Sequence, residues 1–336
     1  MKNINILPGL EIPPSDRKEI SLIREAIECS SSALVSFHAR PDGDAIGGSL
    51  ALKNVLEKKG LDVTIISPSP PSEVFSFLEG FESIRLSLEK KKFDLCFILD
   101  CSDNRRLESL TDILQNSFKI INIDHHQLNR MKADINYVRP DSSSVCELIF
   151  NIALELDSGI DLPAARSIYT GILTDTNRFQ EKNATPRSHR IAAEFIERGI
   201  DPVEIFSKIY GNLSLNRLKL VSRCIESLKV STSGRVAYIV VTPDMLVSTG
   251  TTDETLEGII NYARNLKGVE VGILFRKVSG LNGIKVSFRS KGKVDVGRLA
   301  GHFGGGGHHN AGGCLVKGRF EEAVEKVLGE IEKWME

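Results

Sequence analysis

Four segments of this 336-residue sequence end in side chains that bind metal ions or transfer protons. Each follows a largely apolar run, as a buried strand would. The side chains are His38, Asp42 and Asp44 after residues 33–37, Asp100 after 95–99, Asp124, His125 and His126 after 119–123, and Asp175 after 168–173. Ligands bind at the carboxyl edge of parallel sheets, so we expect these groups to converge there. The pattern predicts a site for more than one metal ion, and therefore hydrolytic chemistry.

The donor atoms of this set indicate which ions it would hold. A single Asp after a strand is usually a helix N-cap or a turn residue, so no one acid is informative alone. The ordered set is more specific: His-x-x-x-Asp-x-Asp, a strand-end Asp, Asp-His-His and a further Asp. It offers imidazole nitrogen and carboxylate oxygen without thiolate. We therefore expect two divalent ions, Mn²⁺ first, with Mg²⁺ or Co²⁺ as alternatives and Fe tolerated, and no structural zinc site.

A glycine-rich segment near the C-terminus is the second motif. Gly304–Gly307 are followed by His308 and His309. Consecutive glycines allow close backbone approach and present several N–H groups to an anion. The segment has neither the Lys-Ser/Thr of a Walker loop nor the Gly-x-Gly-x-x-Gly spacing. A plain turn between helix and strand explains one or two glycines, but not four before two histidines. We expect His309 to face solvent.

The elements that would position these residues alternate between strand and helix. Strands are expected at 33–38, 62–66, 94–100 and 119–123, and helices at 16–29, 45–59, 143–156 and 162–173. This order implies a parallel sheet covered on both faces. Helices alone are expected at 188–197, 203–210 and 215–228.

A second α/β unit follows, with strands at 236–241, 270–276, 284–289 and 313–317 and helices at 295–302 and from Phe320. The expected fold is therefore α/β with two domains. Residues 1–190 would form a parallel-sheet catalytic domain, 191–228 a helical linker, and 229–336 a smaller substrate-binding domain.

Composition limits the partners. The formal net charge is −1 and the pI about 6.7, so the chain lacks the basic surface of proteins that bind long nucleic acids. A nucleic acid substrate would have to be short. No apolar run approaches the length of a membrane span, and the N-terminus does not read as a signal sequence, so we expect a cytoplasmic protein that does not bind membranes. Six scattered cysteines without Cys-x-x-Cys indicate reduced thiols.

Together these motifs resemble those of the DHH phosphoesterase superfamily, which is named after the triplet seen here at 124–126. The glycine-rich segment resembles the GGGH signature of the DHH-associated domain. The pairing is similar to the nanoRNase and pAp-phosphatase branch, bacterial enzymes that degrade very short RNA and 3′-phosphoadenosine 5′-phosphate (pAp). The resemblance spans about residues 20–330. The first motif, from His38 to Asp44, differs slightly in sequence from the family's motif but keeps every ligand position.

The resemblance implies a role for each residue. His38 and Asp42 would hold one ion, Asp44, His125 and Asp175 the second, and Asp100 would bridge the two. Asp124 would orient an imidazole, and His126 would face the scissile phosphate or the leaving oxygen. The implied substrate-binding residues are Arg289, Ser290, Gly305, Gly306, Gly307 and His308. Arg178 stays open between a phosphate contact and a surface ion pair.

The activity that the resemblance implies is metal-dependent hydrolysis of short RNA oligonucleotides to mononucleotides, and of a phosphate of pAp, in the cleft between the domains. One alternative is a phosphodiesterase for cyclic or linear dinucleotides such as c-di-AMP, pApA or pGpG. Another is a nucleotide-sensing module without catalysis, which the complete ligand set disfavours. A manganese pyrophosphatase shares the metal motifs, but the second domain argues against it. The sequence ranks neither the substrates nor the oligomeric state, for which a homodimer is one option.

Overall fold

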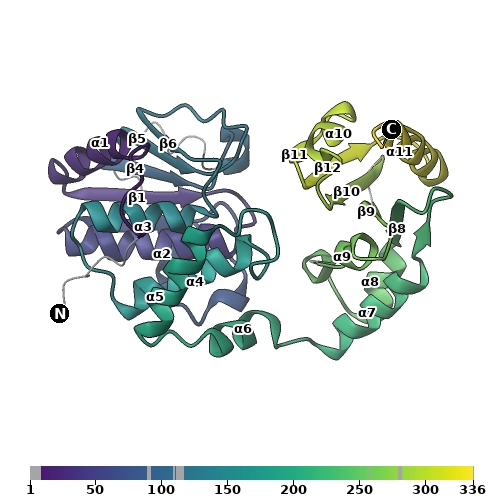
Figure 1. Ribbon diagram of the computed structural model, residues 1–336, viewed down its shortest axis with the longest axis horizontal. Helices are drawn as coiled ribbons and strands as arrows, with labels where there is room; N and C mark the ends of the chain where they lie inside the picture. The colour runs from purple at the N-terminus through teal and green to yellow at the C-terminus, as the bar shows by residue number, and fades with distance from the viewer. Residues whose placement is uncertain are drawn as a thin grey trace. The chain divides into compact units, whose positions relative to one another are not determined.

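The computed structural model describes residues 9–88, 92–108, 110, 117–256, 258–278 and 282–335 (Figure 1). The chain divides into two compact units, Met1–Asn212 and Leu213–Glu336. The division falls inside the segment 191–228 that was predicted as a linker. Helices α5 (Pro186–Glu197) and α6 (Pro202–Tyr210) belong to the first unit, and α7 (Leu215–Glu226) belongs to the second.

The first unit contains a parallel sheet with the strand order β3-β2-β1-β4-β5-β6. Its strands are β1 (Ser32–Phe37), β2 (Asp62–Ile66), β3 (Ile84–Arg85), β4 (Phe93–Leu99), β5 (Ser117–Asp124) and β6 (Ile135–Val138). β1 and β4 are central and buried on both faces, which explains their continuous apolar sequences. The predicted parallel α/β fold is confirmed, and β3 and β6 were missed.

Different elements cover the two faces of this sheet. The helices are α1 (Arg17–Glu28), α2 (Gly43–Lys58), α3 (Val145–Glu155) and α4 (Leu162–Asp175). They pack with α5 on the face that carries Val35 and Phe97, and this forms the main core. The opposite face carries Leu34 and Ile98 and packs against residues of the connections after β4 and β5, including Leu107. Both faces are thus covered, as predicted, but in the described residues α-helices cover only one.

Helix α4 confirms the helix predicted at 162–173. Its apolar run 168–173, compared above with a buried strand, lies inside this helix, whose last residue is Asp175. The run is apolar because it packs in the core, where Ile168 and Ile172 are fully buried. Helices α2 and α4 approach closely, because a Cβ at Gly47 would lie only 2.4 Å from the carbonyl oxygen of Ser167.

The second unit contains a mixed sheet with the order β11-β12-β10-β9-β8-β7, in which only β8 and β9 pair in parallel. Its strands are β7 (Lys229–Val230), β8 (Val236–Val241), β9 (Val271–Lys277), β10 (Ile284–Ser290), β11 (Gly306–His308) and β12 (Ala311–Val316). Helices α7, α8 (Pro243–Thr249) and α9 (Ile260–Arg264) pack on one face, and α10 (Val296–His302) and α11 (Phe320–Lys333) on the other.

The predicted glycine-rich loop is partly wrong, since Gly306–His308 form the edge strand β11 paired with β12.

Within the described ranges, no helix is both long and apolar enough to cross a bilayer.

Candidate metal centre

The predicted ligands of the first unit come together at the carboxyl edge of its sheet. His38 directly follows β1, Asp100 directly follows β4, and Asp124 is the last residue of β5. Asp42 is the N-cap of α2, where its Oδ1 accepts hydrogen bonds from the backbone N–H groups of Asp44 and Ala45. A helix start and three strand ends therefore present these side chains to one place.

Asp100 lies at the centre of the group. Its Oδ2 is 3.1 Å from His38 Nε2, and its Oδ1 is 3.3 Å from His126 Nδ1 and 3.7 Å from His125 Nε2. The residue has φ +50°, and its backbone N–H donates to the carbonyl of Ile123. A left-handed conformation in a non-glycine residue costs about 1–2 kcal/mol. It turns the carboxylate into the cluster as soon as β4 ends.

Three sets of side chains bring ligand atoms within 4.8 Å of one another. The sets are His38, Asp42 and Asp100; Asp44, His125 and Asp175; and Asp100, His125 and His126. The first two coincide with the two ion sites that the resemblance implied, with Asp100 added to the first. The third includes Asp100 and a histidine of the second set, so the two sites adjoin.

Two helix starts hold the carboxylate of Asp44, which is fully buried in the first turn of α2. Its Oδ2 and Oδ1 accept hydrogen bonds of 2.6 and 2.9 Å from the backbone N–H groups of Val145 and Cys146, at the start of α3. Helix N-termini favour negative charge. Gly171 leaves the necessary space, because a Cβ there would lie 2.8 Å from Asp44 Oδ1.

The Asp175 carboxylate faces His125 across 3.5 Å. Its Oδ2 also accepts a hydrogen bond of 3.1 Å from the side-chain amide of Asn183. Behind it, residues 177–179 all have positive φ, between +46° and +65°. Three successive left-handed non-glycine residues are rare, and such strain clusters at functional sites. Thr176, fully buried, supports this turn by accepting from the N–H of Phe179.

His126 is fixed at both ring nitrogens. Its Nδ1 lies 2.7 Å from Asp124 Oδ1, and its Nε2 lies 3.2 Å from an N–H group of Arg106. A guanidinium only donates, so Nε2 accepts and the ring proton sits on Nδ1, where it is donated to Asp124. Asn129 donates to the other oxygen of Asp124. In this arrangement His126 has no nitrogen lone pair left for an ion, and it links Asp124 to Arg106.

Crowding of the acids sets the electrostatics of the centre. Burial raises the pKa of Asp44 to about 6, and the charge of Asp100 adds to this. Burial also raises the pKa of Asp175 well above its usual range. Burial alone would lower the pKa of His38 and of His125, but adjacent carboxylates raise both to about 9. The pKa of Asp100 is lowered despite burial, because it faces three imidazoles.

The residues fit divalent cations. Among the described residues, the buried His38 Nε2 and Asp100 Oδ1 have no hydrogen-bond partner of acceptable geometry. Leaving such atoms unpaired costs about 1–3 kcal/mol each unless another group satisfies them. Four carboxylates beside two imidazoles also repel one another, and cations would remove that repulsion. Hard carboxylate oxygens with imidazole suit Mn²⁺ or Mg²⁺.

The predicted substrate-binding residues of the second unit lie on β10 and β11, except Gly305, which directly precedes β11. Arg289 precedes Ser290, whose side chain is buried and accepts from the N–H of Gly292 while donating to Glu270. This hydroxyl therefore stabilises a turn. A Cβ at Gly305 or Gly307 would lie 2.1–2.2 Å from carbonyl oxygens of β12, so sheet packing alone requires these glycines. The side chain of His308 lies outside the part of the chain that the structure describes.

Arg178 and His309 have partners that the sequence did not indicate. The guanidinium of Arg178 lies 5.1 Å from the ring centre of Tyr210, and Nη2 donates to Asn177. These contacts hold Arg178 in the turn after Asp175, and no surface ion pair is among them. The side chain of His309 is 42% exposed, and it also has protein partners: its Nε2 lies 3.0 Å from the Gly292 carbonyl and its Nδ1 3.4 Å from Asp295.

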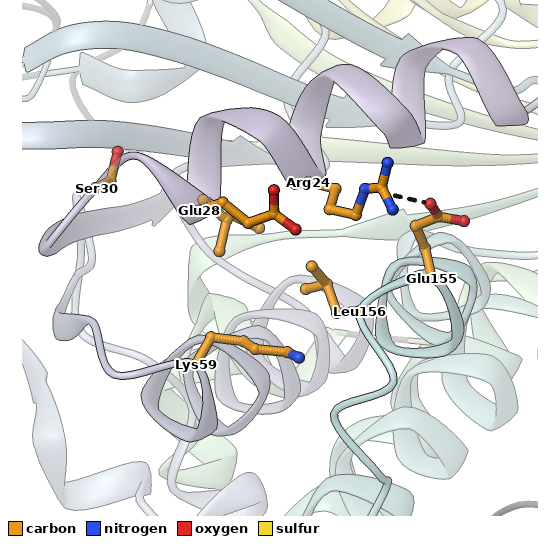
Figure 2. Close-up of a pocket in the computed structure, with 7 residues that line it drawn as sticks. Arg24, Glu28, Ser30, Lys59, Glu155 and Leu156 are labelled. Atoms are coloured by element: carbon orange, nitrogen blue, oxygen red, sulfur yellow. Dashed lines mark ion pairs between the residues drawn. The ribbon is translucent and has the colours of Figure 1, made fainter.

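Two concave regions of the first unit differ in their relation to the centre. One adjoins His38 and is lined by Arg40, Arg105, Arg106 and Glu108. The other lies at the far end of α2 and α3, where Lys59 and Leu156 cap these helices. Figure 2 shows that Arg24 points toward Glu155 in this second hollow, 3.5 Å away. Its acids and bases largely neutralise one another, so we assign it no function.

Sequence reasoning missed Arg106, Asn129 and Asn183. Arg106 lies in the same connection as Asp100, so a basic residue shortly after a strand-end acid was an available signal. Asn129 follows the Asp-His-His triplet by three residues, which is a weaker signal in the sequence. Asn183 lies in a polar turn with no periodicity, and nothing in the sequence marks it.

The chain matches two known domain families. Residues 32–172 match the DHH family, N-terminal domain, and residues 233–336 match the DHHA1 domain. The chain belongs to the DHH family and carries a DHHA1 domain, which confirms the resemblance inferred from its motifs.

Individual relatives extend over nearly the whole chain. A protein of Bacillus subtilis named bifunctional oligoribonuclease and PAP phosphatase NrnA is 29% identical, covering 93% of this chain and 96% of its own. A Thermus thermophilus protein of the same name is 27% identical, with 93% of each chain covered. The crystal structure of an exopolyphosphatase-related protein from Bacteroides fragilis superposes with a TM-score of 0.87 at 30% identity, covering 95% of this chain and 96% of that one.

Proposed function

We propose that this protein is a phosphoesterase that uses two divalent metal ions, preferably Mn²⁺, to hydrolyse short RNA oligonucleotides to mononucleotides and to remove a phosphate from pAp. The observation that carries the proposal is the convergence of three further carboxylates and three imidazoles around Asp100, with buried ligand atoms on Asp100 and His38 that have no hydrogen-bond partner. The names of the Bacillus and Thermus relatives support both activities, because these proteins align along nearly their full length.

In this proposal the first ion would be held by His38, Asp42 and Asp100, and the second by Asp44, His125 and Asp175, with the Asp100 carboxylate shared. Two such ions would activate a water molecule and stabilise the charge on the phosphoryl oxygens. Because the ligands come from rigid strand ends and helix ends, the chain itself fixes their spacing. A bridging carboxylate counters the mutual repulsion of two cations.

Arg106 would contact the scissile phosphate, and His126 would position its guanidinium. Asp124 holds His126 in the tautomer whose Nε2 lone pair faces Arg106. A guanidinium has five N–H donors, so Arg106 keeps others for a non-bridging phosphate oxygen. Its charge would then stabilise the oxygen on which negative charge increases.

The second unit would bind a remote part of the substrate. We propose that Arg289, the backbone of Gly305–Gly307 and His308 contact its terminal phosphate, since guanidinium and backbone N–H groups suit that charge. The hydroxyl of Ser290 is not included, because it holds the adjacent turn. A net charge of −1 favours a short substrate, since aligning a long polyanion requires many basic side chains.

The test is product analysis over a ladder of RNA lengths together with pAp, linear dinucleotides and cyclic dinucleotides, all with Mn²⁺. We expect mononucleotide release from the shortest RNAs, with rates falling as length increases. Undiminished degradation of long strands would contradict the proposal. Faster cleavage of cyclic dinucleotides would favour the dinucleotide phosphodiesterase, and binding without turnover would favour the sensing module.

Asp100→Asn is the variant that tests the metal assignment directly. Asn adopts left-handed backbone readily, so the variant should keep the fold while a neutral amide replaces the bridging carboxylate. Turnover should be abolished and Mn²⁺ binding weakened. Asp103→Asn is the control, because Asp103 lies in the same connection and its carboxylate pairs with Arg105. Near-normal turnover by Asp100→Asn would refute the metal assignment.

A further inference from the structure

Asn183 joins two segments that carry candidate ligands. Its amide nitrogen lies 3.1 Å from Asp175 Oδ2 and 3.2 Å from the Asp175 carbonyl, at the end of α4. The same nitrogen lies 2.8 Å from the carbonyl of Ser143, just before α3. An amide has two N–H donors, so both are committed to these three acceptors. One side chain therefore links the end of α4 to the start of α3.

The start of α3 is the segment that binds Asp44. The N–H groups of Val145 and Cys146, two and three residues after Ser143, donate to both oxygens of that carboxylate. Asn183 thus connects Asp175 directly, and Asp44 through one short backbone segment. These are the two carboxylates of the proposed second ion site.

The turn at Ser143 is rigid enough to transmit this link. The carboxylate of Glu147 accepts from the Ser143 N–H at 3.2 Å and from its hydroxyl at 2.6 Å. Arg187 Nε lies 3.6 Å from the other oxygen of Glu147, and a second nitrogen of Arg187 donates to Asn151. Ser143 and Glu147 are both buried. A shift of the Ser143 carbonyl would therefore disturb several satisfied hydrogen bonds.

We propose that Asn183 is a positioning residue that sets the distance between Asp44 and Asp175, and so determines the affinity of the second metal ion. Two buried carboxylates repel each other when no cation is bound, and only fixed partners can keep them close. The amide provides that restraint on Asp175, and the α3 N-terminus provides it on Asp44. The inference rests on the proposed function, because it assumes that these carboxylates bind an ion.

The test is Mn²⁺ titration of full-length Asn183→Ala by calorimetry, together with its unfolding in the presence of chelator. Loss of a group that orients a metal ligand typically lowers metal affinity about 10–100-fold, and we expect this at one of two sites. Activity should fall at limiting Mn²⁺ and recover at saturating Mn²⁺. Asn54→Ala is the matched control, because Asn54 also donates to a carboxylate at 3.1 Å, that of Asp161 on the surface. It should bind Mn²⁺ as the native chain does.

Asn183→Leu separates the hydrogen bond from packing. It roughly keeps the volume but has neither N–H donors nor a charge that could attract the cation, so affinity should fall about as far as in Asn183→Ala. Native Mn²⁺ affinity in either variant, with or without lowered stability, would overturn the inference. Asp175→Ala separates the positioning role of Asn183 from the metal assignment itself. If it weakens Mn²⁺ binding while Asn183→Ala does not, only the positioning role fails; if neither weakens binding, the metal assignment fails as well.

Discussion

Replacing Gly171 by alanine tests whether the packing of α4 positions Asp44. A Cβ at Gly171 would lie 2.2 Å from Cys146 Sγ, 2.8 Å from Asp44 Oδ1 and 3.0 Å from Cys146 Cβ. Overpacking of this kind costs about 1–3 kcal/mol. The higher helix propensity of alanine returns about 1 kcal/mol. The net loss of stability should be about 0–2 kcal/mol, and the displaced carboxylate should also weaken Mn²⁺ binding.

The assay is thermal unfolding with chelator and with Mn²⁺, together with calorimetric titration. A loss of 1 kcal/mol lowers Tm by about 2–4 °C in a unit of this size. Gly48→Ala is the control, because its Cβ would meet Val145, Cys146 and Leu99 at 3.5–3.8 Å, which is ordinary contact. It should not be destabilised. In Gly171→Ala with Cys146→Ala, stability should partly recover while the Mn²⁺ defect persists. Native stability and native Mn²⁺ affinity in Gly171→Ala would refute the reasoning.

Three further predictions follow from the centre and from the second unit. Without metal, stability should fall as pH rises from about 6.5 to 9, because carboxylates raise the folded-state pKa of His38 and His125 from 6.5 to about 9; saturating Mn²⁺ should suppress this fall in a Tm series. Arg106→Ala should lower kcat by about 10²-fold in steady-state assays, whereas Arg105→Ala, whose guanidinium pairs with Asp103, should change it little. Arg289→Ala should impair hydrolysis of short RNA but largely spare bis-p-nitrophenyl phosphate, and equal losses on both would mean that Arg289 acts in the chemistry.

The central strands and the candidate ligands were predictable because both leave strong local signals. Continuous apolar residues in 33–37 and 95–99 indicate buried parallel strands, and a polar residue directly afterwards must lie at the carboxyl edge. That argument needs only the order of elements. It does not apply to Asp175, which ends the helix predicted at 162–173, because a short apolar run looks alike in a strand and in a buried helix. β3, with two residues, is too short to leave a pattern.

What the sequence could not give are contacts made across the fold. Asn183 matters because the end of α4 meets the start of α3, which no local pattern encodes. The glycines at 305 and 307 were interpreted as a ligand nest, yet the neighbouring strand also requires them. Glycine suits both a ligand nest and close strand packing, and only the paired strands of the structure show that packing requires it here.

The candidate ligands all lie between residues 38 and 175, within the unit that ends at Asn212, and no ligand in the three described sets belongs to the second unit. During synthesis the proposed ion sites could therefore form only after β1, β4, β5 and α4 have assembled. An ion that binds only this assembled state stabilises it by mass action. Chelation should thus make the first unit more susceptible to proteolysis and leave the second unit unaffected, so metal supply would control the lifetime of one half of the chain.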